Sequence, residues 1–307
     1  MSAQFQGRRI ALFGASGQLG APTLKALLAQ GIHSITIIKR QESTNSTPLG
    51  VTAIEGDITN EQFLTTVLKG QDVVLLMPPM AHLDVQMTFI RAAARVGVPY
   101  IFPSEFGSDP FAKQLIQENE LLRKKKAIRD LIEELGISSW ISITSGVWLD
   151  FTLKLGLWDI DHRLRKATIW RGADGKASLS SVSNAAKTIA SVLALPEVEL
   201  AKYRNRAFYM PMWHLTQREI LDGVQGATGT TDADWDITIK DLDEVSTENE
   251  ARIRAGDMMG FFSKFVVTHV MNGYGGDFSD KVISKDIEKL GLQDQDIVEA
   301  IGEVISK

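Results

Sequence analysis

The stretch IALFGASGQLG, residues 10–20, decides the fold of this chain. Its first four residues form a short apolar run, which is typical of a buried parallel strand. Three glycines follow with the spacing G-x-x-G-x-x-G, and a helical pattern then runs until Gly31. A strand, a glycine-rich turn and a helix in this order are typical of a dinucleotide-binding unit, whereas the same glycines elsewhere would be a weak signal.

Each glycine of this turn has its own physical role. Gly14 permits a tight turn, Gly17 lets the backbone approach a pyrophosphate, and Gly20 lets the helix pack closely on the sheet. The amides and partial positive charge of the helix N-terminus favour a bound phosphate. The alternative is an ordinary tight turn without a ligand. We predict that the whole turn contacts a dinucleotide: Gly14, Ala15, Ser16, Gly17, Gln18, Leu19 and Gly20.

The end of the second expected strand, SITIIKR at 34–40, indicates which dinucleotide binds. An NAD site usually has an acidic residue here for the ribose 2′-hydroxyl. This chain has Lys39 and Arg40 instead, and charge-assisted bonds from arginine to a phosphate are worth roughly 1.5–3 kcal/mol. We therefore predict NADP(H), against the alternative of two solvated basic side chains. Asp57 and Ile58, after the third strand, are expected beside the adenine.

Apolar runs and helical patterns alternate as far as residue 143, which predicts a parallel sheet with crossover helices. The expected fold is α/β: a Rossmann-type doubly wound parallel sheet with a smaller mixed α/β substrate lobe. We assign residues 1–147 to NADP binding and 148–307 mainly to the substrate lobe. A helix capped by Asn184 is expected to return to the sheet. The second half also predicts an antiparallel hairpin, 167–179, a capping box at Thr216 and Glu219, and one long helix, 247–271.

Composition excludes several functions. The 307 residues include 33 basic and 38 acidic side chains, a net charge of −5, and no cysteine. A disulfide scaffold, a thiolate metal site and a cysteine nucleophile are therefore excluded. The acidic balance argues against nucleic acid as a partner. The five histidines lack metal-ligand spacing. No apolar run reaches membrane-spanning length and no signal peptide is recognisable, so we expect a soluble cytoplasmic protein that binds no membrane and is a monomer or homodimer.

A lysine on an apolar helix face is the candidate for chemistry. At about 100° per residue, Leu121, Ile128 and Ile132 form one stripe of an expected helix over 117–135. Lys125 lies inside the edge of this stripe and Lys124 lies close to it. Burial would lower the pKa of such a lysine towards neutrality. Alternatively, both lysines cover apolar neighbours with their stems, and periodicity does not choose between them.

Four segments carry a family resemblance: GASGQLG, IIKR at 37–40, GDIT at 56–59 and above all FPSEFGSD at 102–109. They resemble the isoflavone reductase-like group of NmrA-like, atypical short-chain dehydrogenase/reductase proteins. In that group a lysine lies in the pattern K-x-x-[IV]-R, which selects Lys125 here. The resemblance implies these cofactor contacts: Lys125, Met77, Pro78, Pro79, Gln86, Ser145 and Gly146. The basic side chain of Arg129 is also expected to contact NADPH.

The resemblance implies an NADPH-dependent reductase of a small aromatic or conjugated metabolite, with Lys125 as general acid/base. Residues 41–50 lack a second lysine that the plant enzymes carry, and Lys39 is expected to replace it. The expected apolar pocket wall, with ordinary core as the alternative, consists of Trp148, Phe151, Met210, Phe261, Phe262 and Tyr274. One rival function is a non-catalytic NADP(H) sensor of NmrA type. Another is a nucleotide-sugar epimerase, although no tyrosine precedes a lysine by four positions.

Overall fold

The computed structural model describes residues 6–41, 47–283, 287, 290 and 295–306. Its largest element is a seven-stranded parallel sheet in the order β11-β6-β5-β4-β1-β2-β3. The strands are β1 (Arg9–Phe13), β2 (Ser34–Arg40), β3 (Thr52–Gly56), β4 (Val73–Leu76), β5 (Tyr100–Phe102), β6 (Ser139–Thr144) and β11 (Arg206–Tyr209). The strand order reverses between β1 and β4, which creates a crevice at their carboxyl ends. The predicted Rossmann-type sheet is confirmed.

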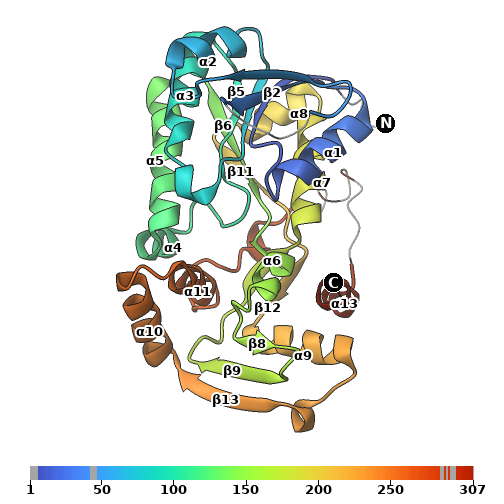
Figure 1. Ribbon diagram of the computed structural model, residues 1–307, viewed down its shortest axis with the longest axis vertical. Helices are drawn as coiled ribbons and strands as arrows, with labels where there is room; N and C mark the ends of the chain where they lie inside the picture. Colours follow the sequence, from blue (N-terminus) through green and yellow to red (C-terminus); the bar gives the residue numbers. More distant parts are fainter. Residues whose placement is uncertain (1–5, 42–46, 284–286, 288–289, 291–294, 307) are drawn as a thin grey trace.

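Helices cover both faces of this sheet (Figure 1). One face packs with α1 (Gly20–Gln30) and α7 (Val182–Leu193) into a single apolar core. The opposite face packs with three helices into a second core: α2 (Glu61–Leu68), α3 (Val85–Arg95) and α5 (Glu120–Leu135). Because α7 and β11 come from the second half of the chain, the polypeptide returns to the large sheet after leaving it.

Two three-stranded sheets form the other part of the molecule. One has the order β12-β10-β7 and the other β13-β9-β8. Their strands are β7 (Val147–Trp148), β8 (Ile160–Asp161), β9 (Lys166–Arg171), β10 (Ala177–Ser180), β12 (Trp213–Leu215) and β13 (Asp236–Asp241). The predicted hairpin over 167–179 is wrong, because β9 and β10 lie in different sheets. All four residues of β10 are buried, so this strand packs between neighbours on both sides.

Short helices complete the fold around these sheets (Figure 1). They include α4 (Lys113–Glu118), α6 (Leu149–Lys154), α8 (Glu197–Leu200), α9 (Gln217–Thr228), α10 (Leu242–Arg254), α11 (Met258–His269) and α13 (Ile297–Ile305), with 3-10 turns η1 (Met80–His82), η2 (Ala201–Tyr203), η3 (Asp232–Asp234) and η4 (Ser279–Lys281). Helix α13 packs on α9. Among all described residues, no helix has the length and apolarity needed to cross a membrane.

Three helix predictions need correction. The helix expected over 117–135 is broken at Asn119, whose backbone is extended with φ −114° and ψ 116°. The helix expected over 247–271 is two helices, because Gly256 has φ +79° and the Asp257 carboxylate caps α11. Helix α7 is capped by Ser181 rather than Asn184: the Ser181 hydroxyl accepts from the Asn184 amide at 3.1 Å. The capping box predicted at 216–219 is confirmed.

Candidate active site

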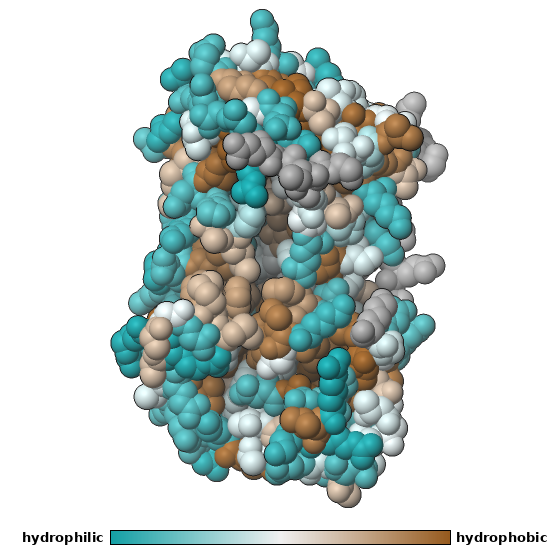
Figure 2. Space-filling model, in the orientation of Figure 1, coloured by the Kyte–Doolittle hydropathy of each residue, from teal (hydrophilic) through white to brown (hydrophobic). Residues whose placement is uncertain are grey.

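A cavity of about 1320 Å³ lies at the carboxyl ends of β1 and β4, where the sheet order reverses. Residues of the glycine turn, of strand ends in the large sheet and of helices α5, α6 and α11 line it. Figure 2 shows the hollow between the upper and lower parts of the molecule, with apolar side chains gathered around it. A ligand in this cavity would contact both parts.

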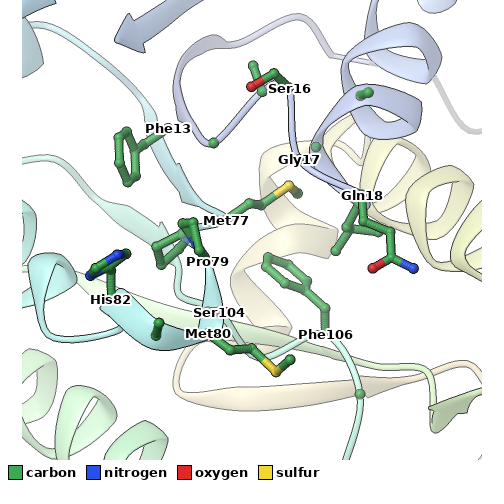
Figure 3. Close-up of a pocket in the computed structure, with 18 of the residues that line it drawn as sticks. Phe13, Ser16, Gly17, Gln18, Met77, Pro79, Met80, His82, Ser104 and Phe106 are labelled. Atoms are coloured by element: carbon green, nitrogen blue, oxygen red, sulfur yellow. The ribbon is translucent and has the colours of Figure 1, made fainter. Parts of the chain in front are cut away.

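The glycine turn forms one end of the cavity, where Ser16, Gly17 and Gln18 face Met77 and Pro79 (Figure 3). Gly14 has φ +88°, and a Cβ there would lie 2.0 Å from the Met77 carbonyl oxygen. A Cβ on Gly17 would meet one atom within 4 Å, the Gly14 carbonyl oxygen of the same turn, at the tight distance of 3.3 Å. No side chain caps the N-terminus of α1. The turn therefore leaves room and amide donors for a phosphate, as a bound dinucleotide requires.

The two basic residues of β2 also line the cavity. Lys39 is half-buried, and its Nζ lies 3.8 Å from Glu55 Oε2 on the neighbouring strand β3. Arg40 is exposed. Ile58 lines the cavity as well. Asp57 does not. Its carboxylate accepts from the Thr59 hydroxyl at 2.6 Å and the Thr59 amide at 2.9 Å, which lowers the pKa of Asp57.

The contacts implied by the resemblance fall into two groups. Met77, Pro78, Pro79 and Gly146 line the cavity. Gln86 and Ser145 lie behind it and hold the loop 103–109: the Gln86 side-chain oxygen accepts from the Ser104 amide at 2.8 Å, and the Ser145 hydroxyl donates to the Phe106 carbonyl at 3.0 Å. Both residues therefore act on the shape of the cavity through the loop.

Of the three consecutive lysines on α5, Lys125 alone lines the cavity. Its side chain is half-buried, and burial lowers the pKa of its ammonium to about 8. Lys124 is exposed and pairs with Glu120 at 2.9 Å. Lys126 pairs with Asp130 at 2.7 Å. Of these three lysines, Lys125 is therefore the one that lies beside the cavity with a lowered pKa.

Arg129, expected as a cofactor contact, does not line the cavity. Its guanidinium forms an ion pair with the buried carboxylate of Glu105 and donates to the Pro110 carbonyl at 2.8 Å. Burial lowers the pKa of Arg129 to about 10. Its surroundings are those of a residue that holds the loop 103–110 against α5.

Ser108 and His269 were not predicted as site residues. Ser108 lines the cavity, and its hydroxyl lies 2.8 Å from His269 Nε2. His269 Nδ1 lies 2.6 Å from the Phe265 carbonyl, which can only accept, so Nδ1 carries the proton and Nε2 accepts from Ser108. Burial lowers the pKa of His269 to about 4. The lone pairs of Ser108 therefore face the cavity. In the sequence, the only signal for Ser108 is its place in the motif FPSEFGSD.

The predicted apolar wall is divided between three places. Trp148, Phe151 and Phe262 line the large cavity. Met210 lies in the core between the sheet and α7, and Phe261 packs at the edge of the core around α5. Tyr274 lines a separate cavity of about 140 Å³. Within the described ranges, no group of three or more His, Cys, Asp or Glu residues could hold a metal ion.

The fold and the cavity define a class: a Rossmann-type nucleotide-binding protein with a second lobe over the crevice. Within it, the chain belongs to the NmrA-like family, whose model matches residues 6–291. It is 24% identical to the oxidoreductase aprR of Aspergillus flavus over 303 residues, 97% of this chain and 98% of that protein. The family resemblance seen in the sequence is confirmed.

Solved structures show the same fold. AtPrR2 with NADP+ and (+)pinoresinol is similar with a TM-score of 0.78 and 21% identity, over 97% of this chain and 99% of that one. An isoflavone reductase is similar with a TM-score of 0.77 and 18% identity, over 97% of this chain and 99% of the other. The shared architecture extends over both parts of the molecule.

Proposed function

We propose that the protein is an NADPH-dependent reductase of a small aromatic or conjugated metabolite, with Lys125 as general acid. The observation that carries the proposal is the position of Lys125 in the cavity that the glycine turn opens, with its pKa lowered to about 8 by burial. Two relationships support it: aprR is named an oxidoreductase, and AtPrR2 has been solved with NADP+.

The residues of the turn and of β2 fit NADP(H). Gly17 lines the cavity beside the helix N-terminus and has no side chain to stand between its backbone and the pyrophosphate. Lys39 and Arg40 offer positive charge for the 2′-phosphate. NADPH, when bound, supplies a hydride for an electrophilic carbon. Lys125 holds a proton on Nζ and donates it to the substrate oxygen or carbon that gains electron density.

The remaining lining residues orient the substrate. Trp148, Phe151 and Phe262 give an apolar, aromatic surface that excludes water from the reacting atoms. The lone pairs of Ser108 accept a hydrogen bond from a substrate hydroxyl, because the serine proton is directed at His269. A phenolic substrate meets both requirements.

We also propose that the chain divides this work between its halves. Residues 1–147 bind NADP(H). Strand β11 and helix α7 return to the large sheet and belong to the same part of the molecule. Residues 148–307 otherwise form the lobe that contacts the substrate, since Trp148, Phe151 and Phe262 belong to it. We place this protein in the cytoplasm, where NADPH is available.

The test is NADPH oxidation over a panel of isoflavones, benzylic ethers, aromatic ketones and (+)pinoresinol. We expect turnover of at least one compound, and a loss of about 10²- to 10⁴-fold in kcat in Lys125→Ala with NADPH affinity unchanged. Lys124→Ala is the matched control: it removes the same charge from the adjacent, exposed position and should keep full activity. Tight NADPH binding without any turnover, with a copurifying protein partner, would instead favour the sensor function.

A further inference from the structure

We propose that the ion pair between Arg129 and Glu105 is a positioning device that fixes Lys125 against the cavity-lining loop 103–109. This inference rests on the proposed function of Lys125. Neither member of the pair lines the cavity, and the two side chains are only 6% and 2% exposed. They would act on the reaction through the residues they hold.

The guanidinium of Arg129 holds the loop at two points. It pairs with the Glu105 carboxylate and donates to the Pro110 carbonyl at 2.8 Å. Its flat face lies over the Trp140 ring, 5.6 Å from the ring centre. An arginine fork that binds two acceptors fixes direction as well as distance, which a lysine ammonium does not do.

Helix α5 carries Lys125 and Arg129 one turn apart, with about 6 Å of helix between them. The loop has a matching arrangement. Glu105 faces away from the cavity, whereas Ser104, Phe106 and Ser108 line it. A link between Arg129 and Glu105 therefore sets the distance between the Lys125 ammonium and the groups of the loop.

The loop is also held from its other sides. The Gln86 side chain accepts from the Ser104 amide at 2.8 Å, and the Trp148 indole donates to the Phe106 carbonyl at 3.0 Å. These contacts tie the loop to α3 and to the start of the second lobe, and the ion pair ties it to α5. Since a displacement of about 1 Å can cost roughly 10² in rate, loosening the α5 contact should reduce turnover.

The experiment compares Arg129→Met with Arg8→Met. Arg8 is also a buried arginine, and its guanidinium donates to the Leu193 carbonyl at 2.5 Å. Unlike several residues of loop 103–109, Leu193 does not line the cavity, and neither does Arg8. We expect a kcat about 30- to 100-fold lower in Arg129→Met, an NADPH Kd within threefold of wild type, and partial recovery in Arg129→Lys. In Arg8→Met we expect unchanged kcat. If Arg129→Met does not fold, Glu105→Gln takes its place, because it breaks the ion pair and keeps the shape of the side chain. It should show the same loss of about 30- to 100-fold in kcat.

Three results would overturn the proposal. Unchanged kcat in folded Arg129→Met would make the pair purely structural. Equal losses in kcat and NADPH affinity would make Arg129 a cofactor contact.

A third measurement needs no turnover. Lys125 in the NADP+ complex is labelled with acetic anhydride at a series of pH values, and the extent of labelling is measured by mass spectrometry. The labelling midpoint should move in Arg129→Met and not in Arg8→Met, and an unmoved midpoint contradicts positioning. If wild type reduces no panel compound, the proposed function fails, but the labelling measurement still tests whether the Arg129–Glu105 pair positions Lys125.

Discussion

The two ends of the cavity are built in different ways. At the proposed nucleotide end, the contiguous glycine turn and the basic end of β2 line the cavity, and the glycines serve by the absence of side chains. At the proposed reacting end, Lys125, Ser108 and Trp148 come from a helix, a loop and a short strand, and it is their side chains that the proposed chemistry uses. Substitutions at the first end should therefore alter binding, and substitutions at the second should alter turnover.

The largest effect is expected at the nucleotide end, from Gly14→Ala. The new Cβ would lie 2.0 Å from the Met77 carbonyl oxygen at a φ of +88°. Strain and overpacking should together cost about 2–6 kcal/mol, with loss of measurable NADPH binding. Calorimetric titration with NADPH and a urea unfolding curve measure the two effects.

Gly97→Ala is the control for this substitution. Gly97 has φ +72°, but nothing lies within 4 Å of its added Cβ. It should cost only about 1–2 kcal/mol of stability and leave NADPH binding intact. Equal behaviour of the two variants would show that the close approach to Met77 is unimportant.

An intermediate effect on selectivity is expected from Arg40→Gln. Loss of one charge-assisted bond to a phosphate, worth roughly 1.5–3 kcal/mol, should weaken NADPH roughly 10- to 100-fold. NADH lacks the 2′-phosphate, so its Kd should stay within twofold. Parallel titrations with both cofactors make NADH the internal control, and equal weakening of both would remove Arg40 from the 2′-phosphate site.

The smallest effect is expected at the reacting end, on stability. Because burial lowers the pKa of Lys125 from 10.5 to about 8, the folded state holds this proton less tightly than the unfolded state. Wild-type stability should therefore rise as the pH increases from 8 towards 10.5. Lys125→Met should stabilise the protein at pH 7 by about 1–3 kcal/mol, and by less at pH 9.5. Urea unfolding at both pH values measures this, and a destabilised Lys125→Met at pH 7 would contradict the burial of a charged lysine.

The difference between the two ends also decides what the sequence could predict. The glycine turn and the basic end of β2 are contiguous, so strand, turn, helix and cofactor preference could all be predicted from local pattern. Helical periodicity left Lys124 and Lys125 both open, and the structure separates them because only Lys125 meets the cavity.

Contacts between distant residues could not be predicted. The pair of Ser108 with His269 joins positions 161 residues apart, and His269 shows no local signal because its role is set by the Phe265 carbonyl and by burial. The positive charge of Arg129 predicts a contact with NADPH, but the buried Glu105 provides a partner inside the protein. The hairpin expected at 167–179 failed because a short buried strand can pair with any neighbour the tertiary fold supplies.

The most direct test of the account is the pH dependence of kcat/KM in wild type, which reports the ionisation of groups in the enzyme before it binds substrate. Burial places the pKa of Lys125 at about 8, and the proposed reduction needs its protonated form. With any panel compound that is turned over, kcat/KM should be constant below pH 7 and fall tenfold per pH unit above about pH 8. The residual kcat/KM of Lys125→Ala should lack this fall. A wild-type kcat/KM that stays constant to pH 10, or the same fall in Lys125→Ala, would contradict proton donation by Lys125.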